Sequence, residues 1–257
     1  MVTAVDAERD AVLAGRQPAV GTVAGYQVHR ALTAAGLVDV ASGGLGPVAA
    51  AVSTGCLLTG GYHLVVSAGI GGGFPAALVG SVAVAHAVVH ADLGAETADG
   101  FVSMAELGWG AVRHRLDPML AAEFGRRTGG VTGAVLTVST VTGSQARAEQ
   151  LLARDPDAVA EAMEGIGCYL AASRAGVPFA ELRAIANQVG PRHREAWRVS
   201  DALAALTAAF DRLLAEPLPI PAPPEPTLPV TESPAAKTSA EPPAAEPPAA
   251  EPPGAIR

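Results

Sequence analysis

The amino-acid sequence predicts an α/β protein, built as a three-layer α/β/α sandwich. Short runs rich in Val, Ile or Leu, bounded by Gly, Ser or Asn, alternate along the chain with stretches of helical spacing. Such alternation indicates helices packed on both faces of one sheet. Aromatic residues make up only 4% of the chain and glycines number 29, which favours a tightly packed core of Ala, Val and Leu.

The strands are expected where the apolar runs are short and continuous, at 1–5, 37–42, 63–69, 81–91, 133–141 and 179–187. Helices are expected where apolar residues recur every three to four positions, at 47–59, 146–155, 157–176 and 200–214. The helix over 157–176 has a start signal in Asp155-Pro156-Asp157 and a stop signal in Gly176 followed by Pro178.

Composition changes at Glu216, where a Pro/Ala/Glu-rich segment with repeated EPPAA begins. Such a proline density removes backbone donors and leaves little apolar surface to bury, so we expect a folded domain over 1–215 and a disordered tail over 216–257. The first residues carry charges before any long apolar stretch, which argues against a signal peptide. Without a convincing membrane segment, we expect a cytoplasmic protein.

The charge balance argues for a small-molecule partner. The formal net charge is -8, which disfavours nucleic acid or an anionic membrane as a partner. Lys237, in the tail, is the only lysine, so the folded part has no lysine for a Schiff base or a phosphate-binding loop. The cysteines, Cys56 and Cys168, form no CxxC motif and are expected to be small buried apolar residues.

Two glycine-rich turns are expected after strands, at 43–47 and 68–74, where backbone N–H groups can face a sugar, a phosphate or a water. The segment 44–49 also fits the GxGxxA pattern of dinucleotide-binding proteins, but the acidic residue expected about twenty positions later is absent. No Lys or Arg lies between Arg30 and Arg113, so these turns lack the nearby cation typical of a phosphate site, which favours water over phosphate.

The segment 160–194 resembles the signature of the nucleoside phosphorylase and nucleosidase superfamily. The matching residues are Met163-Glu164, Val177-Pro178-Phe179 and Arg183-Ala184-Ile185-Ala186-Asn187, and the N-terminal Ala4-Val5-Asp6-Ala7-Glu8 resembles the first strand of the nucleosidases. The resemblance spans residues 1 to about 214. Within the superfamily, 92–96, 99–101 and 187–192 are most similar to futalosine hydrolases of menaquinone biosynthesis.

This resemblance implies a central mixed, twisted sheet and hydrolysis of the N-glycosidic bond of futalosine to hypoxanthine and dehypoxanthine futalosine. It implies that Glu8 activates the water, that Glu164 holds the ribose hydroxyls and that Met163 packs on the sugar. Gly71 and Gly72 belong to the second glycine turn and are expected to contact substrate. The family also implies a homo-oligomer, with no metal and no cofactor.

Asn187 departs from the adenine-specific nucleosidases, which have aspartate at this position. An amide can accept a hydrogen bond from a protonated N7 and donate to O6, so Asn187 matches a 6-oxopurine such as hypoxanthine. Phe101 is expected to cover the aromatic end of the substrate and Arg192 to pair with its carboxylate. His86 and His90 have spacing compatible with metal ligation, but no further ligand cluster accompanies them.

Three alternatives remain open from the sequence. They are a purine nucleoside phosphorylase, a methylthioadenosine/adenosylhomocysteine nucleosidase and a non-catalytic protein that binds nucleosides. Retention of Glu8, Glu164 and Asn187 together speaks against the third, because binding alone does not require a carboxylate that activates water.

Overall fold

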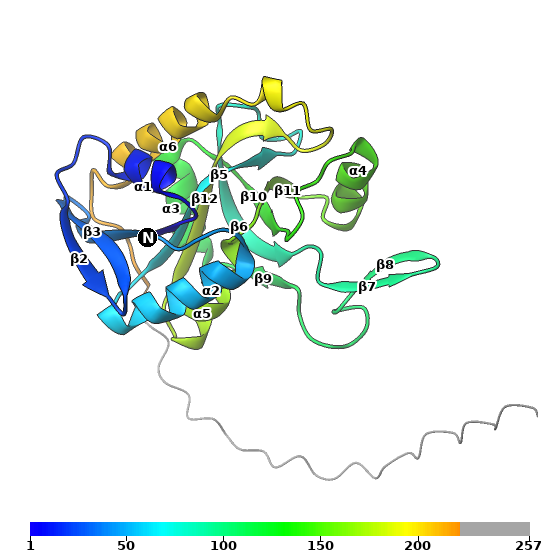
Figure 1. The fold of residues 1–257 in the computed structure, drawn as a ribbon, viewed down its shortest axis with the longest axis horizontal. Coiled ribbons are helices and arrows are strands. Elements are labelled where there is room, and N and C mark those ends of the chain that lie inside the picture. Colours follow the sequence, from blue (N-terminus) through cyan, green and yellow to red (C-terminus); the bar gives the residue numbers. More distant parts are fainter. Residues whose placement is uncertain (222–257) are drawn as a thin grey trace, which may run out of the picture. The chain divides into compact units, whose positions relative to one another are not determined.

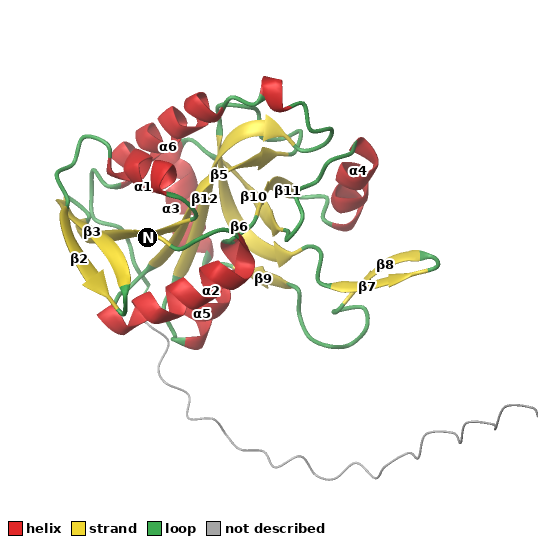
Figure 2. Ribbon diagram, viewed as in Figure 1, coloured by secondary structure: helices red, strands yellow, loops and turns green. Residues whose placement is uncertain are grey.

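A mixed β-sheet that closes on itself organises the computed structural model, which describes residues 1–221 (Figures 1 and 2). The closure comes from an antiparallel pairing of the last strand of the ring with the first. In order around the ring, the strands are β5 (Val65–Gly73), β12 (Phe179–Gln188), β6 (Val82–His90), β10 (Val131–Thr137) and β11 (Ala158–Ala162). Parallel and antiparallel pairs both occur, so the sheet is mixed, as predicted.

The sheet continues beyond β5 into the N-terminal part of the chain. β1 (Val2–Thr3) lies parallel to β5 and to β4, and a meander leads outward from β4 to the edge of the sheet. The remaining strands are β2 (Ala19–Val23), β3 (Tyr26–Thr33), β4 (Gly36–Ser42), β7 (Gly94–Thr97), β8 (Gly100–Ser103) and β9 (Arg113–Arg115). β9 pairs with β6, and β7 and β8 form a separate hairpin that projects from the body in Figure 1.

Helices cover both faces of the sheet, which confirms the predicted layers. On one face α1 (Asp6–Leu13), α3 (Pro118–Thr128) and α6 (Val199–Leu213) share a core with β5, β6 and β12. On the other face α2 (Gly46–Leu57) and α5 (Gly165–Arg174) form a second core. α4 (Gln145–Arg154) closes a smaller cluster beside β10, and short 3-10 turns occur at Leu58–Gly60 and Arg194–Ala196. Within residues 1–221, no helix combines the length and apolar character required to cross a bilayer.

The tight contact between α2 and α5 depends on a glycine. A methyl group added at Gly167 would lie 2.1 Å from the carbonyl oxygen of Pro47, which is too short for any side chain. Gly167 therefore lets the first turn of α5 approach the first turn of α2. This approach brings the first glycine-rich turn, just before α2, next to Glu164 at the start of α5.

The helix predicted over 157–176 is wrong in its first third, because 158–162 is the strand β11 and the helix begins only at Gly165. The Ala-rich sequence has good helix propensity, but every residue of β11 is buried between β10 and β5. A short apolar run that is buried on both faces shows neither the alternation typical of a strand nor the 3.6-residue repeat typical of a helix. Its conformation therefore depends on its pairing with neighbouring strands.

The second glycine-rich turn, predicted over 68–74, is also corrected, because β5 continues through Gly73. Strand β11 crosses β5 closely there, and a methyl group added at Gly71 would lie 2.8 Å from the carbonyl oxygen of Glu161. The glycines therefore permit close strand packing rather than a turn. The tail predicted over 216–257 falls mostly outside the described residues, from 222 onward, so that prediction stays untested.

Candidate active site

A cavity of about 270 Å³ lies near the carboxyl ends of β1, β5, β11 and β12. This volume approaches the usual range of small-molecule sites, about 300 to 1,000 Å³. The cavity brings together the predicted residues Glu8, Gly71, Gly72, Met163, Glu164 and Asn187. The other lining residues are Ala4, Val5, Leu45, Ile70, Val141, Glu161, Ala162, Ala186, Trp197 and Val199.

Glu8 occupies the first turn of α1 and is only 4% exposed. The N–H groups of Ala4 and Val5 donate to its Oε2 at 2.9 and 3.3 Å, and the Ile70 N–H donates to Oε1 at 2.9 Å. These donors join the start of the helix to β5 and fix the carboxylate at the cavity wall. Glu8 is therefore an oriented acceptor, not a carboxylate in solvent.

Glu164 lies at the start of α5, directly after β11, and is 5% exposed. The Gly46 N–H, from the first glycine-rich turn, donates to Glu164 Oε1 at 3.1 Å. A carboxylate at a helix N-terminus is stabilised by the helix dipole. The first glycine-rich turn therefore contributes to the site in two ways. Its Gly46 binds the Glu164 carboxylate, and its Leu45 lines the cavity.

Arg183 belongs to the site, although no sequence pattern marked it as functional. It is completely buried, and its Nη1 donates to Glu164 Oε2 at 3.2 Å, its Nε to Glu181 Oε1 at 2.9 Å and its Nη2 to Ser67 Oγ at 2.6 Å. Burial lowers the pKa of Arg183, but Glu181, Glu164 and Glu8 outweigh it and raise the pKa above the usual value. The guanidinium is a permanent counter-charge behind the carboxylates.

Asn187 lies near the end of β12, where its backbone pairs with Gly72 of β5. Its Nδ2 donates to the carbonyl oxygen of Gln188 at 2.9 Å. A methyl group added at Gly72 would lie 3.3 Å from Asn187 Nδ2, so the missing side chain of Gly72 keeps space open beside the amide. The amide and the two carboxylates therefore line one cavity.

The family model of the phosphorylase superfamily matches residues 3–216. The futalosine hydrolase of Streptomyces coelicolor is 51% identical over 223 residues, which cover 83% of this chain and 93% of that protein. The chain belongs to the futalosine hydrolase family. The futalosine hydrolase of Acidothermus cellulolyticus is 43% identical over 220 residues, which cover 83% of this chain and 88% of the relative. The predicted membership is thus confirmed.

Solved structures confirm the fold. A 5′-methylthioadenosine/S-adenosylhomocysteine nucleosidase from Colwellia psychrerythraea in complex with adenine superposes with a TM-score of 0.71 and 21% identity. The match covers 84% of this chain and 96% of that chain. This likeness supports a nucleoside phosphorylase-like α/β architecture for this futalosine hydrolase family member.

Phe101 does not lie at the cavity in this futalosine hydrolase family member. The ring of Phe101 lies near the guanidinium groups of Arg154 and Arg147, with centroid distances of 4.3 and 5.8 Å, and lines a separate hollow with His90 and Arg113. Since β8 belongs to the projecting hairpin, its side chains are carried away from the carboxylates of the same chain.

Arg192 does not line the cavity either. Its guanidinium lies 5.5 Å from the ring centroid of Trp197, and Trp197 does line the cavity. Arg192 therefore contacts a residue of the cavity wall but is not itself part of that wall. Trp197 and Glu161 were not predicted; an indole in a polar loop and a glutamate in an Ala-rich run gave no pattern that marks them.

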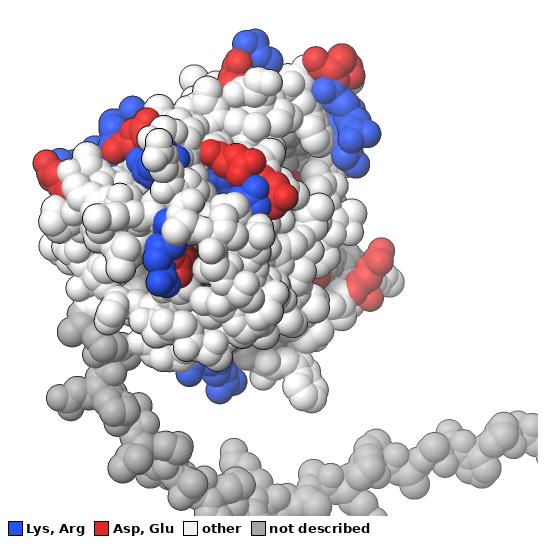
Figure 3. All heavy atoms as spheres, turned by 60° about the vertical axis from the view of Figure 1, so that its left-hand side comes forward, with Lys and Arg blue, Asp and Glu red and all other residues white. Residues whose placement is uncertain are grey.

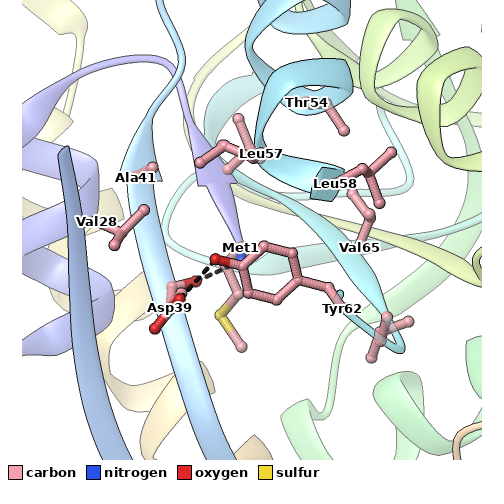
Figure 4. A pocket seen from close by; sticks show the side chains of 11 residues that line it. Met1, Val28, Asp39, Ala41, Thr54, Leu57, Leu58, Tyr62 and Val65 are labelled. Atoms are coloured by element: carbon pink, nitrogen blue, oxygen red, sulfur yellow. Dashed lines mark hydrogen bonds between the residues drawn. The ribbon is translucent and has the colours of Figure 1, made fainter. Parts of the chain in front are cut away.

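Two further hollows share Asp39 and lie apart from this cavity. The hollow in Figure 4 has a volume of only about 20 Å³, and in it the Met1 amino group donates to the Asp39 carbonyl oxygen at 2.6 Å. The neighbouring hollow is larger, about 420 Å³, but the Asp39 carboxylate there is already paired with Arg30 at 2.7 Å and with the Tyr62 hydroxyl at 2.6 Å. Each of these hollows has a single lining carboxylate, that of Asp39, whereas the cavity described above has three.

No cluster of three or more His, Cys, Asp or Glu side chains suited to a metal ion occurs within residues 1–221. The two histidines with metal-compatible spacing contact different aspartates. His86 Nε2 lies 2.8 Å from Asp157 Oδ2, and His90 Nε2 lies 3.6 Å from Asp92 Oδ1.

Proposed function

We propose that this chain hydrolyses the N-glycosidic bond of futalosine and releases hypoxanthine and dehypoxanthine futalosine, a step of menaquinone biosynthesis. The observation that carries the proposal is the joint presence of Glu8, Glu164 and Asn187 at one cavity. Relatives that are futalosine hydrolases, at 51% and 43% identity, support the choice of substrate.

The proposed mechanism assigns one end of the cavity to the sugar. Cleavage of the C–N bond develops positive charge on the ribose, so carboxylates nearby stabilise the transition state. Glu164 accepts hydrogen bonds from the ribose hydroxyls while Arg183 holds it from behind at 3.2 Å. Met163 packs on the sugar face. Glu8, oriented by its backbone donors, removes a proton from the attacking water.

At the other end, Asn187 recognises the base. Negative charge flows into the purine as the bond breaks, while the oxygen of the attacking water bonds to C1′ of the ribose. The proton that Glu8 removes from this water passes to solvent, and the leaving purine takes up a proton at N7 from solvent water, because an amide cannot supply one. The amide oxygen of Asn187 accepts from N7–H, and the amide NH₂ donates to O6. This two-point contact fits hypoxanthine, which is the base that futalosine carries.

Water is the better nucleophile for this site than phosphate. None of the residues that line the described cavity is Lys or Arg. The guanidinium of Arg183, which contacts the cavity carboxylate Glu164, is also engaged by Glu181 and Ser67. A phosphate dianion next to Glu8 and Glu164 therefore has no free cation to neutralise it.

We also infer the setting in which the enzyme works. The formal net charge of -8, and the mixture of acidic and basic side chains on the face shown in Figure 3, disfavour nucleic acid as a partner. The charged N-terminal residues, which do not resemble a signal peptide, favour the cytoplasm. Leu45, Val48 and Val52 are 65%, 76% and 55% exposed along the start of α2. This apolar stripe borders the cavity through Leu45 and supports self-association of the chain.

The decisive experiment incubates the purified protein with futalosine, inosine or methylthioadenosine, with and without phosphate, and measures free base. We expect hypoxanthine release from futalosine at a rate that does not depend on phosphate. Base release from inosine only when phosphate is present would contradict the hydrolase and support a phosphorylase. Preferential release of adenine from methylthioadenosine would instead indicate a methylthioadenosine nucleosidase.

A further inference from the structure

Glu161 is a buried carboxylate at the cavity to which the mechanism above gives no role. It lies on β11 and is 5% exposed. The Thr142 N–H donates to its Oε1 at 2.9 Å, and the Thr142 hydroxyl donates to its Oε2. Among the ion pairs of residues 1–221 none involves Glu161, and burial raises its pKa above the usual value. A buried carboxylate without a cation is costly, so its presence at a cavity points to a ligand.

The sheet register places Glu161 opposite Asn187. Both residues pair with the same residue of β5, Gly72, one from β11 and the other from β12. Residues directly opposite each other on adjacent strands point to the same face of a sheet. Their backbones are separated by two strand spacings, roughly 10 Å. Since Gly72 has no side chain, a flat ring that lies over it has the amide on one side and the carboxylate on the other.

Thr142 leaves Glu161 able to accept further hydrogen bonds. Each oxygen of a carboxylate has two lone-pair sites, and Thr142 occupies one on each oxygen. In both hydrogen bonds Thr142 is the donor and Glu161 the acceptor, which favours the ionised carboxylate. The free lone pairs can therefore accept an N–H or O–H donor from a ligand.

The purine edge distinguishes two substrate classes at this position. In a 6-oxopurine, N1 carries a hydrogen beside O6, whereas in a 6-aminopurine N1 is a bare acceptor. A carboxylate accepts from the first and repels the lone pair of the second. If Asn187 contacts N7 and O6, the side chain across Gly72 approaches the same edge from the side of N1.

We propose that Glu161 accepts the N1–H of the base and selects 6-oxopurine over 6-aminopurine nucleosides. The proposal rests on the proposed function, because it assigns a residue to the base end of the same cavity. Two side chains then select a 6-oxopurine, namely Glu161 on β11 and Asn187 on β12, the two strands that flank β5 at Gly72.

Calorimetric binding of free bases tests the proposal without turnover. We expect the wild type to bind hypoxanthine about 10- to 100-fold more tightly than 1-methylhypoxanthine, which lacks the N1 hydrogen. Glu161→Gln should lower the affinity for hypoxanthine by a similar factor and raise the affinity for adenine. The glutamine side chain of this variant can still contact Thr142, and Glu149→Gln, an exposed change on α4, serves as the control.

The outcomes separate this proposal from the proposed function. Equal affinity of the wild type for hypoxanthine and 1-methylhypoxanthine, absence of binding included, overturns the role of Glu161 even when futalosine is hydrolysed. The role is also overturned if Glu161→Gln lowers the affinities for hypoxanthine and for adenine by the same factor. A wild type that does not hydrolyse futalosine but shows the expected base discrimination contradicts the proposed function and leaves the assignment of Glu161 supported.

Discussion

Arg183 and Glu164 form a buried ion pair behind the cavity, with Nη1 of the arginine 3.2 Å from Oε2 of the glutamate. The same guanidinium pairs with Glu181, whose Oε2 has no hydrogen-bond partner among the described residues and whose pKa is raised by burial. One cation therefore compensates two buried carboxylates. Removing it leaves both uncompensated in the protein interior.

We expect Arg183→Met to lower the free energy of unfolding by about 3 to 5 kcal/mol, the usual cost of breaking a buried ion pair on one side. Urea denaturation measures this change. Arg126→Ala is the matched control, since Arg126 forms an exposed ion pair with Glu123 within α3, and its midpoint should stay unchanged. An Arg183→Met variant as stable as this control would show that the network is not important for stability.

Glu8→Gln tests the assignment of the general base. Gln cannot take a proton from water, so we expect kcat for futalosine to fall about 100- to 10,000-fold while KM changes little. Steady-state kinetics with hypoxanthine detection gives both constants. Asp10→Asn, an exposed change on the same helix, should keep full activity. A near-normal rate for Glu8→Gln would remove Glu8 from the mechanism.

The sequence allowed much of this site to be predicted because its residues lie in short local motifs. Met163-Glu164 and the segment that ends at Asn187 resemble a family pattern, and the cavity contains these residues together with Glu8. Long strands such as β6 and β12 were also predicted, since their apolar runs are bounded by polar or glycine residues.

The remainder depended on contacts between distant segments. β11 resembles a helix in composition and becomes a strand only because β10 and β5 flank it. Glu161 faces Asn187 only through the register of both strands with Gly72. The side chain of Phe101 was expected at the substrate, but its distance from the cavity follows from the projection of the β7–β8 hairpin, which no local pattern encodes.

The two cysteines should differ in reactivity toward a thiol reagent such as Ellman's reagent. Cys168 is completely buried, and burial raises the pKa of its thiol to about 11, so almost no reactive thiolate exists at pH 8. Cys56 on α2 was also predicted to be buried, and this is wrong, because it is partly exposed. We expect one thiol of the native chain to react rapidly, and Cys56→Ala to abolish that reaction while Cys168→Ala preserves it. Rapid labelling of native Cys56→Ala would contradict the packing of α5.

The exposed stripe on α2 provides a test of self-association. Val48→Glu places a charge at a position that is 76% exposed, where an apolar residue has no partner within the described chain. If a second copy of the chain covers this face, the substitution buries a charge in the interface and should dissociate the oligomer. Light scattering after size-exclusion chromatography measures this dissociation as a lower mass. Val20→Glu, at a site of 61% exposure on β2, is the control. Unchanged mass for Val48→Glu would exclude α2 from the interface.

Asn187→Asp tests the recognition of the base at N7 and O6. An aspartate has no NH₂ to donate to O6, and its negative charge repels that oxygen, whereas it can accept from the amino group of adenine. We expect the ratio of kcat/KM for hypoxanthine nucleosides to that for adenine nucleosides to fall by about 10- to 100-fold. Gln188→Glu is the matched control: it makes the same chemical change one residue later, where the side chain donates to the carbonyl oxygen of Ala77 instead of lining the cavity. The loss of preference for hypoxanthine nucleosides should occur only in Asn187→Asp, because the Asn187 amide, unlike that of Gln188, lies beside the open space over Gly72. An unchanged preference in Asn187→Asp, or an equal change in Gln188→Glu, would show that base selection resides elsewhere in the cavity.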